Sequence, residues 1–329
     1  MSAVTAGRPD LRVTLRRPGD ALPRASIGGV PILWNNVDLA DLRLGTDPAT
    51  ILDEIARTGY EGTQLGIGFP EGAELRDALA GRRLRLAEVY LSIPATVDGP
   101  TPDAPAVARE RLRLAIDGAA EVLTVALDLT AERDGRAGRA AAAGTPVLTG
   151  AGLDALLAHI HDIAREAGAG GLLRTAFHPH GGTFIETPDE IRQLADRLDP
   201  ALVGICLDVG HVIVGGGDPV AMLGELGERV TQVHLKDVDP DVVGRLRDGT
   251  LGGFSDAIRS RLFTELGSGV LDVDGVIAKL AERDYDGWLM VEQDSGWGPP
   301  SESAAIGRRV LAEALRRAGS PTTAKEERA

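Results

Sequence analysis

Residues that bind metals and transfer protons gather in the second half of the chain, directly after short apolar runs. The segment FHPHGGTFIE contains two histidines and a glutamate, and it is followed along the chain by LDVGH, VHLKD and VEQD. Four of the six histidines lie in these segments. A single histidine after an apolar run is usually a boundary residue. Three successive runs that each end in histidine and a carboxylate instead predict one shared site.

A glutamate, an aspartate, a histidine and a second glutamate, one from each of these segments, form a set of ligands rich in oxygen. Mn²⁺, Mg²⁺ or Co²⁺ fits such a set better than structural zinc, because structural zinc favours thiolates and imidazoles. The single cysteine, Cys206, excludes a disulfide framework and a cysteine-based metal cluster. The residue types therefore predict a divalent metal ion with mainly oxygen ligands.

The elements that must position these groups alternate between apolar runs and helical patterns. In 47–59, for example, Asp47 is a capping residue, Pro48 occupies the first turn and Gly59 ends the helix. The predicted strands are 28–34, 61–67, 84–93, 121–129, 171–177, 201–209, 229–238 and 286–294. The predicted helices are 47–59, 72–81, 105–120, 152–168, 187–199, 218–228, 272–284 and 303–319, with one more helix inside the excursion 239–271.

Eight strands that alternate with helices predict an α/β protein with a single (β/α)₈ TIM barrel. A doubly wound open sheet is the alternative, but it usually needs a GxGxxG turn after an early strand, and the sequence has none there. In a barrel the catalytic groups lie at the carboxyl ends of the strands. The first two strands bring Trp34, Asn35, Asn36 and Gln64 to that end, where they are candidates for substrate binding.

Three segments fall outside this alternation. Residues 1–25 have no sustained period and are predicted to be a flexible extension, and 320–329 a polar tail, so that 26–319 forms the catalytic barrel. The segment 131–147 is rich in Ala, Gly and Arg and is predicted to be a long loop. It is either a low-complexity insertion or a lid over the site, because long loops in compact domains are often functional.

Charge and composition narrow the possible partners. Lys plus Arg is 35 and Asp plus Glu is 49, which gives a net charge of −14. Such a chain is not expected to bind nucleic acid or anionic membranes, because both require a basic face. No stretch approaches the length of a transmembrane helix, and the first residues lack the apolar core of a signal peptide. With its single cysteine, the chain is expected to be cytoplasmic.

Five segments resemble a known family. FHPHGGTFIETPDEI, GICLDVGHVIVGGGDPV, RVTQVHLKDV, FTELGSGVLDVDGVI and YDGWLMVEQD are similar to the xylose-isomerase-like barrels, and within them to the myo-inosose-2 dehydratases of inositol catabolism. The early segment PILWNNVDL resembles that family's opening motif, and the resemblance covers roughly 26–315. This sequence departs from the family at Pro179, where a third histidine is usual, and at Gln64, where an acid is usual.

The resemblance implies a bound metal ion, Mn²⁺ or Co²⁺ with Mg²⁺ as a further possibility, and a set of site residues. His178 is an alternative to Glu186 as the ligand from the fifth strand. His180 and His211 are implied to lie near the substrate hydroxyls, with Lys236 beside the metal. The implied ligands are Glu186, Asp208, His234 and Glu292.

The activity implied is the metal-dependent dehydration of a keto-inositol such as 2-keto-myo-inositol. A metal ion can stabilise the enediolate that forms when the α-proton leaves, and water is then lost from the β-carbon. A ketose isomerase or epimerase on the same site is the alternative, and a non-catalytic sugar-binding module is a third possibility. An abasic-site endonuclease shares this type of barrel, but six histidines and a charge of −14 argue against it. The expected partner is a cyclic polyol ketone or ketose, and a homo-oligomer is possible.

Overall fold

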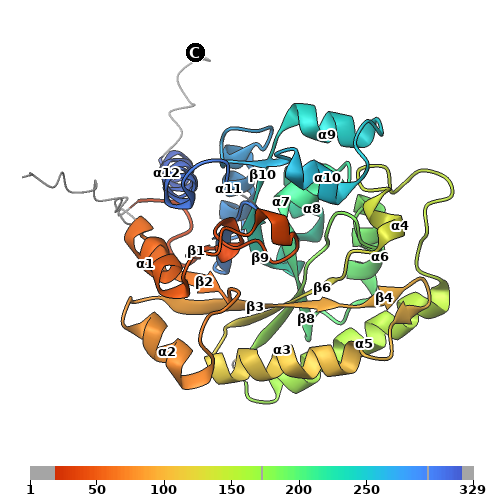
Figure 1. Cartoon of the computed structure of the whole chain (residues 1–329), viewed down its shortest axis with the longest axis horizontal. Helices are drawn as coiled ribbons and strands as arrows, with labels where there is room; N and C mark the ends of the chain where they lie inside the picture. Colours follow the sequence, from red (N-terminus) through yellow and green to blue (C-terminus); the bar gives the residue numbers. More distant parts are fainter. Residues whose placement is uncertain (1–18, 172, 295, 321–329) are drawn as a thin grey trace, which may run out of the picture.

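Eight short parallel strands close into a barrel in this computed structural model, in the spatial order β1, β12, β9, β8, β7, β6, β3, β2 (Figure 1). The structure describes residues 19–171, 173–294 and 296–320. The barrel strands are β1 (Ser26–Gly29), β2 (Gly62–Gln64), β3 (Arg85–Ile93), β6 (Val122–Leu127), β7 (Arg174–Phe177), β8 (Val203–Asp208), β9 (Val230–Leu235) and β12 (Trp288–Val291). The predicted (β/α)₈ barrel is thus confirmed.

Helices cover the outside of the barrel and bury their apolar faces against it. In α1, the carboxylate of Asp47 accepts the Thr50 N–H at the start, and Gly59 ends the helix with a left-handed φ of 86°. The outer helices are α1 (Pro48–Thr58), α2 (Gly72–Ala80), α3 (Ala104–Gly118), α5 (Gly150–Gly168), α6 (Pro188–Arg197), α8 (Pro219–Leu226), α11 (Val273–Ala281) and α12 (Pro300–Gly319). None of the helices in the described part of the chain is long and apolar enough to cross a membrane.

The structure differs from the sequence predictions mainly beyond the strand ends. The predicted strand 28–34 stops early, because Pro31 starts a 3₁₀ turn, Pro31–Leu33. The apolar run after Asp208 forms the short helix α7 (Val209–Val214), which the sequence analysis missed. The excursion 239–271 contains two helices instead of one. Its elements are β10 (Asp237–Val238), α9 (Pro240–Arg247), α10 (Phe254–Arg259) and β11 (Phe263–Thr264), and a second small ribbon pairs β4 (Ala95–Thr96) with β5 (Gly99–Pro100).

The segment 131–147 is fixed to the barrel by a buried ion pair. It begins with a helical turn, α4 (Ala131–Asp134), where the sequence predicts a loop. The guanidinium of Arg133 is fully buried and bonds both carboxylate oxygens of Glu190, at 2.8 and 3.0 Å. Glu190 also accepts the backbone N–H of Thr187 in the capping box of α6. Arg133 therefore joins this segment to the start of α6.

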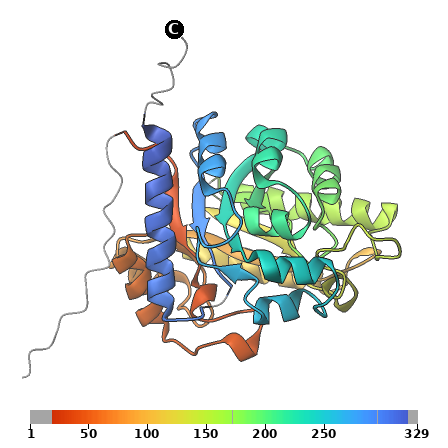
Figure 2. The ribbon, with the colours of Figure 1, turned by 90° about the horizontal axis from the view of Figure 1, so that it is seen from above.

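The segment that precedes β1 packs against the last helix, α12, which runs beside β1 (Figure 2). Leu22 is buried, and the N–H of Ala21 bonds the carbonyl of Leu315 on α12 at 3.0 Å. Of the predicted extension 1–25, residues 1–18 lie outside the described residues, as do residues 321–329 of the predicted tail.

We expect Arg133→Met to reduce the free energy of unfolding by about 3 kcal/mol, because it leaves a mostly buried carboxylate without its cation. Urea unfolding followed by circular dichroism measures the loss. Arg192→Met is the matched control, since Arg192 pairs with Asp189 and Glu225 on the surface, and its loss should stay below about 1 kcal/mol. Equal losses in the two variants would show that burial of the Arg133–Glu190 pair does not increase its contribution to the free energy of unfolding.

Candidate active site

Side chains from four neighbouring barrel strands meet at the carboxyl end of the barrel. Asp208 ends β8, His234 lies in β9, Glu292 follows β12 and His178 follows β7. The ring centroids of His178 and His234 are 5.0 Å apart, and His234 Nδ1 lies 2.7 Å from Glu292 Oε2. All four are buried except Glu292, which is partly exposed. The convergence predicted from the strand ends is therefore present for this set.

Asp208 uses its two carboxylate oxygens for different purposes. Oδ1 accepts the backbone N–H of His211 at 2.9 Å and so caps α7. Oδ2 lies 3.6 Å from His178 Nε2 and 3.9 Å from His234 Nδ1. The capping bond fixes the orientation of the carboxylate and leaves Oδ2 directed at the two imidazoles.

His234 is oriented by a buried carboxylate from the opposite side of the barrel. Its Nε2 lies 3.1 Å from Oε2 of Glu88, which is completely buried on β3. An ionised Glu88 can only accept this hydrogen bond, so Nε2 carries a proton and Nδ1 is the nitrogen that faces Glu292 and Asp208. Although burial alone would lower the pKa of His234, the carboxylates of Glu88 and Glu292 raise it well above its ordinary value, so Nδ1 holds a proton unless a cation takes its place.

Three buried ligand atoms in this cluster lack a well-aligned hydrogen bond within the described residues. They are Asp208 Oδ2, His234 Nδ1 and Glu292 Oε2. These atoms lie within 4.8 Å of one another. A lone pair of His234 that faces a carboxylate oxygen at 2.7 Å requires a proton or a cation between them. The donor set of one imidazole and two carboxylates fits a divalent ion such as Mn²⁺.

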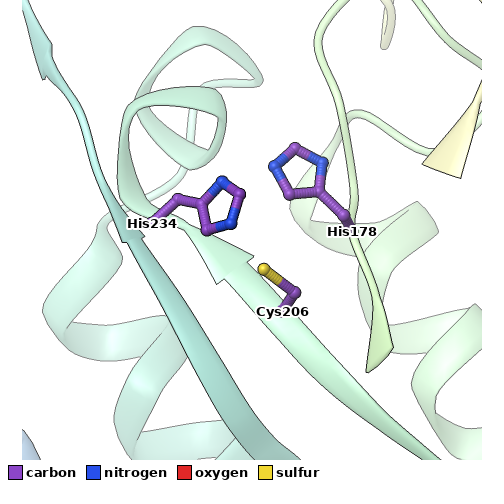
Figure 3. Close-up of side chains that lie close together, drawn as sticks. All are labelled: His178, Cys206 and His234. Carbon is purple, nitrogen blue, oxygen red and sulfur yellow. The ribbon is translucent and has the colours of Figure 1, made fainter. Parts of the chain in front are cut away.

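A second group that could hold a metal lies one layer deeper. Figure 3 shows the rings of His178 and His234 facing one another, with the thiol of Cys206 on β8 close to both. Burial raises the pKa of Cys206 to about 12, so its thiol stays protonated at neutral pH. Because the thiolate is the form that binds metals, the group of Asp208, His234 and Glu292 is the better candidate.

Lys236 supplies a buried positive charge beside the cluster. Its ammonium lies 2.7 Å from Asp294 Oδ1, 3.0 Å from Glu292 Oε1 and 3.4 Å from Asp208 Oδ2. Burial raises the pKa of Asp294 to about 7, with the charge of Glu292 acting in the same direction. Burial opposes ionisation of Glu292 as well, but Lys236 and His234 hold the pKa of that carboxyl below its ordinary value.

The other two predicted histidines form a pair next to this cluster. The rings of His180 and His211 are in contact, with centroids 3.8 Å apart and planes inclined by 37°, and Phe254 lies against both. His211 is buried and its Nε2 lies 3.2 Å from the ammonium of Lys236, whereas His180 is partly exposed. Burial lowers the pKa of His180 to about 3 and that of His211 well below its ordinary value, so both rings are neutral.

Glu186 is not brought to the candidate metal cluster. It belongs to none of the groups of potential ligands found among the described residues. Its two oxygens accept the backbone N–H groups of Gly138 and Gly182, each at 2.7 Å. Glu186 thus ties the segment 131–147 to the turn after β7. His178, the alternative ligand from that strand, is the residue that lies beside Asp208.

The four predicted substrate-binding residues lie at the carboxyl end of the barrel, and their polar side-chain atoms form hydrogen bonds within the protein. Trp34 Nε1 donates to Glu54, the amide of Asn35 bonds the backbone of Thr46, and Asn36 donates to the carbonyl of Asp294 in a short bond. Asn35 lines one cavity together with Gln64 and Tyr90. Tyr90 lies against His178, with ring centroids 5.6 Å apart, so this cavity adjoins the histidines.

Glu88 is the residue that the sequence analysis did not assign. Besides His234 it accepts hydrogen bonds from Gln64, Thr124 and Gln232. The available signal was a single carboxylate inside the apolar run LRLAEVYLSI, where an unpaired charge would be costly. Gln64 stands at the end of β2 and donates to Glu88, so its amide also belongs to this network.

Comparison with known proteins agrees with the fold. A family model described as "Xylose isomerase-like TIM barrel" matches residues 47–314. Inosose dehydratase 1 of Bacillus cereus (strain ZK / E33L) is 31% identical over 290 residues, which cover 87% of this chain and 96% of the relative. The inosose dehydratase of Clostridium botulinum (strain Eklund 17B / Type B) is 30% identical, over 88% and 97% of the two chains.

A solved structure shows the same architecture at lower sequence similarity. D-Allulose 3-epimerase from Methylomonas sp., in complex with D-allulose, superposes with a TM-score of 0.65 at 17% identity, covering 88% of this chain and 97% of that one. At this identity the likeness concerns the fold alone. The family match over residues 47–314, together with the barrel, shows that the chain belongs to the xylose isomerase-like TIM barrel family.

Proposed function

We propose that the protein is a metal-dependent dehydratase that removes water from an inosose such as 2-keto-myo-inositol. The observation that carries this proposal is the group of ligand atoms on Asp208, His234 and Glu292 that lack a well-aligned hydrogen bond, beside the contacting rings of His180 and His211. The similarity to two inosose dehydratases over nearly their whole length supports the substrate class. We further propose that residues 26–319 form the catalytic domain and that the protein acts in the cytoplasm on a small molecule.

Asp208, His234 and Glu292 would hold the ion, and His178 would complete the set. When bound, Mn²⁺ or Co²⁺ would act as a Lewis acid that stabilises negative charge on the substrate's carbonyl oxygen. Lys236 adds a fixed positive charge for the same purpose, because its ammonium is held at the cluster by three carboxylates. His180 is partly exposed, and its ring lies 5.6 Å from that of His178, so a substrate arriving from solvent can reach it.

The proposed activity is tested by metal removal and replacement. We expect protein treated exhaustively with a chelator to be inactive toward 2-keto-myo-inositol. Addition of Mn²⁺ or Co²⁺ should restore formation of the dehydrated product, a dione, which is measured by its ultraviolet absorbance. Elemental analysis confirms the metal content of each sample. Full activity without metal would contradict the proposal, and an epimerised product, identified by NMR spectroscopy, would assign the chain to the isomerase or epimerase class instead.

The ligand set is tested by single substitutions. Asp208→Ala and Glu292→Ala should each abolish stoichiometric binding of Mn²⁺, because each removes one of the ligand oxygens that lack a well-aligned hydrogen bond. Glu186→Gln should retain the metal, since Glu186 bonds the backbone of Gly138 and Gly182 instead. Isothermal titration calorimetry measures binding, and circular dichroism verifies the fold. Retention of metal by both alanine variants, or its loss from Glu186→Gln, would show that this ligand set is wrong.

Glu88 is expected to control metal affinity without touching the ion. Glu88→Gln removes the charged acceptor that places the ring proton of His234 on Nε2, so affinity for Mn²⁺ should fall about 10- to 100-fold. Thr124→Val removes another donor to the same carboxylate and leaves His234 bonded to Glu88, so it is the control and should have a smaller effect. Competition with a chromogenic chelator measures both affinities. Unchanged affinity in Glu88→Gln would exclude the positioning role.

A further inference from the structure

The cavity beside the histidines contains polar side chains that the proposed mechanism does not use. Gln64 on β2, Tyr90 on β3 and Arg111 on α3 line it. The ring centroids of Tyr90 and His178 are 5.6 Å apart, and His178 Nε2 lies 3.6 Å from Asp208 Oδ2. Tyr90 thus connects the cavity to His178 and, through it, to the candidate metal cluster.

Arg111 is a partly buried arginine whose charge has no partner. Its guanidinium forms no hydrogen bond or ion pair with any of the described residues, and no carboxylate is among the described side chains that line the cavity. Arg113, on the same helix, is exposed and pairs with Glu71, Glu110 and Asp117 at 2.8, 2.7 and 3.1 Å. Because burial removes water from a guanidinium, the N–H groups of Arg111 need acceptors from a ligand.

Tyr90 and Gln64 add a hydroxyl and an amide to the same lining. The amide of Gln64 donates from Nε2 to Glu88 at 3.1 Å, which leaves its Oε1 as the atom that can accept. The hydroxyl of Tyr90 has no hydrogen bond within the described part of the chain, and such a group both donates and accepts. Together with Arg111, these groups offer a ligand both donors and acceptors.

The rest of the lining is mostly apolar. Its apolar members come from the segments after β1 and β2 and are Pro31, Ile32, Val37, Leu65 and Ile67. The two segments are packed tightly, since a Cβ atom on Gly66 would lie 3.0 Å from Cγ of Pro31. The cavity therefore combines apolar walls with a few polar groups, which is the usual composition of a site for a small molecule.

A cyclic polyol matches this composition better than an anion does. In 2-keto-myo-inositol every hydroxyl is equatorial, so the hydroxyls project from the rim of the ring and both faces carry axial C–H bonds. The apolar walls fit the faces, and the polar groups fit the rim. A phosphate or carboxylate would use the guanidinium of Arg111, but its negative charge would also face the amide oxygen of Gln64, which only accepts.

We propose that this cavity is the polyol subsite of the active site, in which Arg111 and Tyr90 bind the hydroxyls on the ring edge opposite the carbonyl. The identity of the substrate rests on the proposed function. With the carbonyl at the candidate metal cluster, the opposite edge of the ring extends into the cavity that Tyr90 adjoins. The hydroxyl on that edge is retained in the product, so its contacts determine affinity and specificity rather than the chemical step.

Matched substitutions test the subsite. Arg111→Met removes the guanidinium, so KM for 2-keto-myo-inositol should rise about 10- to 100-fold while kcat stays within about threefold. Arg113→Met removes the same charge from the same helix outside the cavity and should change KM by less than about twofold. Tyr90→Phe keeps the ring against His178 and removes only the hydroxyl, so KM should rise about 2- to 10-fold. Equal KM values for the two methionine variants would overturn the proposal.

A deoxy analogue identifies the hydroxyl that Arg111 binds. The analogue that lacks the hydroxyl opposite the carbonyl should have a higher KM with the unsubstituted protein, and most of this increase should vanish in Arg111→Met, because both changes remove the same contact. Independent effects would show that Arg111 does not bind this hydroxyl. Competitive inhibition by inorganic phosphate that disappears in Arg111→Met would assign the cavity to anions and would also overturn the polyol subsite.

Binding without turnover separates this proposal from the proposed function. The probe is scyllo-inositol, which has the same equatorial hydroxyls but no carbonyl, and isothermal titration calorimetry measures its Kd. We expect Arg111→Met to weaken binding about tenfold or more relative to Arg113→Met. If the metal-loaded protein does not dehydrate the inosose but shows this difference, the dehydratase proposal fails and the subsite stands. If it dehydrates the inosose and the difference is absent, the subsite is wrong and the dehydratase proposal stands.

Discussion

The burial of opposite charges at the mouth of the barrel is the constraint on which the rest of the site depends. Lys236 is enclosed by the carboxylates of Asp208, Glu292 and Asp294 within 3.4 Å, and all but Glu292 are almost completely buried. Removing such charges from water costs several kcal/mol for each ion unless partners compensate. The parallel strands supply those partners, because their carboxyl ends meet at the same place and alternate residues point inward.

The sequence allowed the barrel and the core of the site to be predicted because both depend on local patterns. Apolar runs end at Asp208, His234 and Glu292, and closure of the barrel brings those ends together without further information. Glu186 could not be placed in this way, because it lies in an irregular turn where spacing along the chain does not determine direction. Its oxygens instead accept hydrogen bonds from two backbone N–H groups, and no pattern of residue types in the sequence predicts such bonds.

Residues inside a strand were harder to interpret than residues at its end. Glu88 lies in a mostly apolar run, and its partners come from β2, β6 and β9, which are distant in sequence. Only the closed barrel brings them within hydrogen-bonding distance. The short helix α7 was missed for a different reason: its residues Val209–Val214 include four apolar side chains that are equally suited to a strand, and the cap from Asp208 decides in favour of a helix.

The two uses of Asp208 also explain the spacing of the LDVGH segment. Oδ1 must reach the backbone N–H three residues later, where His211 stands, and Oδ2 must face the candidate metal cluster at the same time. Glutamate has one more methylene group, so it could not satisfy both geometries from the same backbone position. Gly210, between them, faces the backbone oxygen of Lys236, which a Cβ atom would approach to 2.8 Å. The three-residue interval between Asp208 and His211 is thus set by the capping of α7. In a chain without α7, this interval would not be constrained.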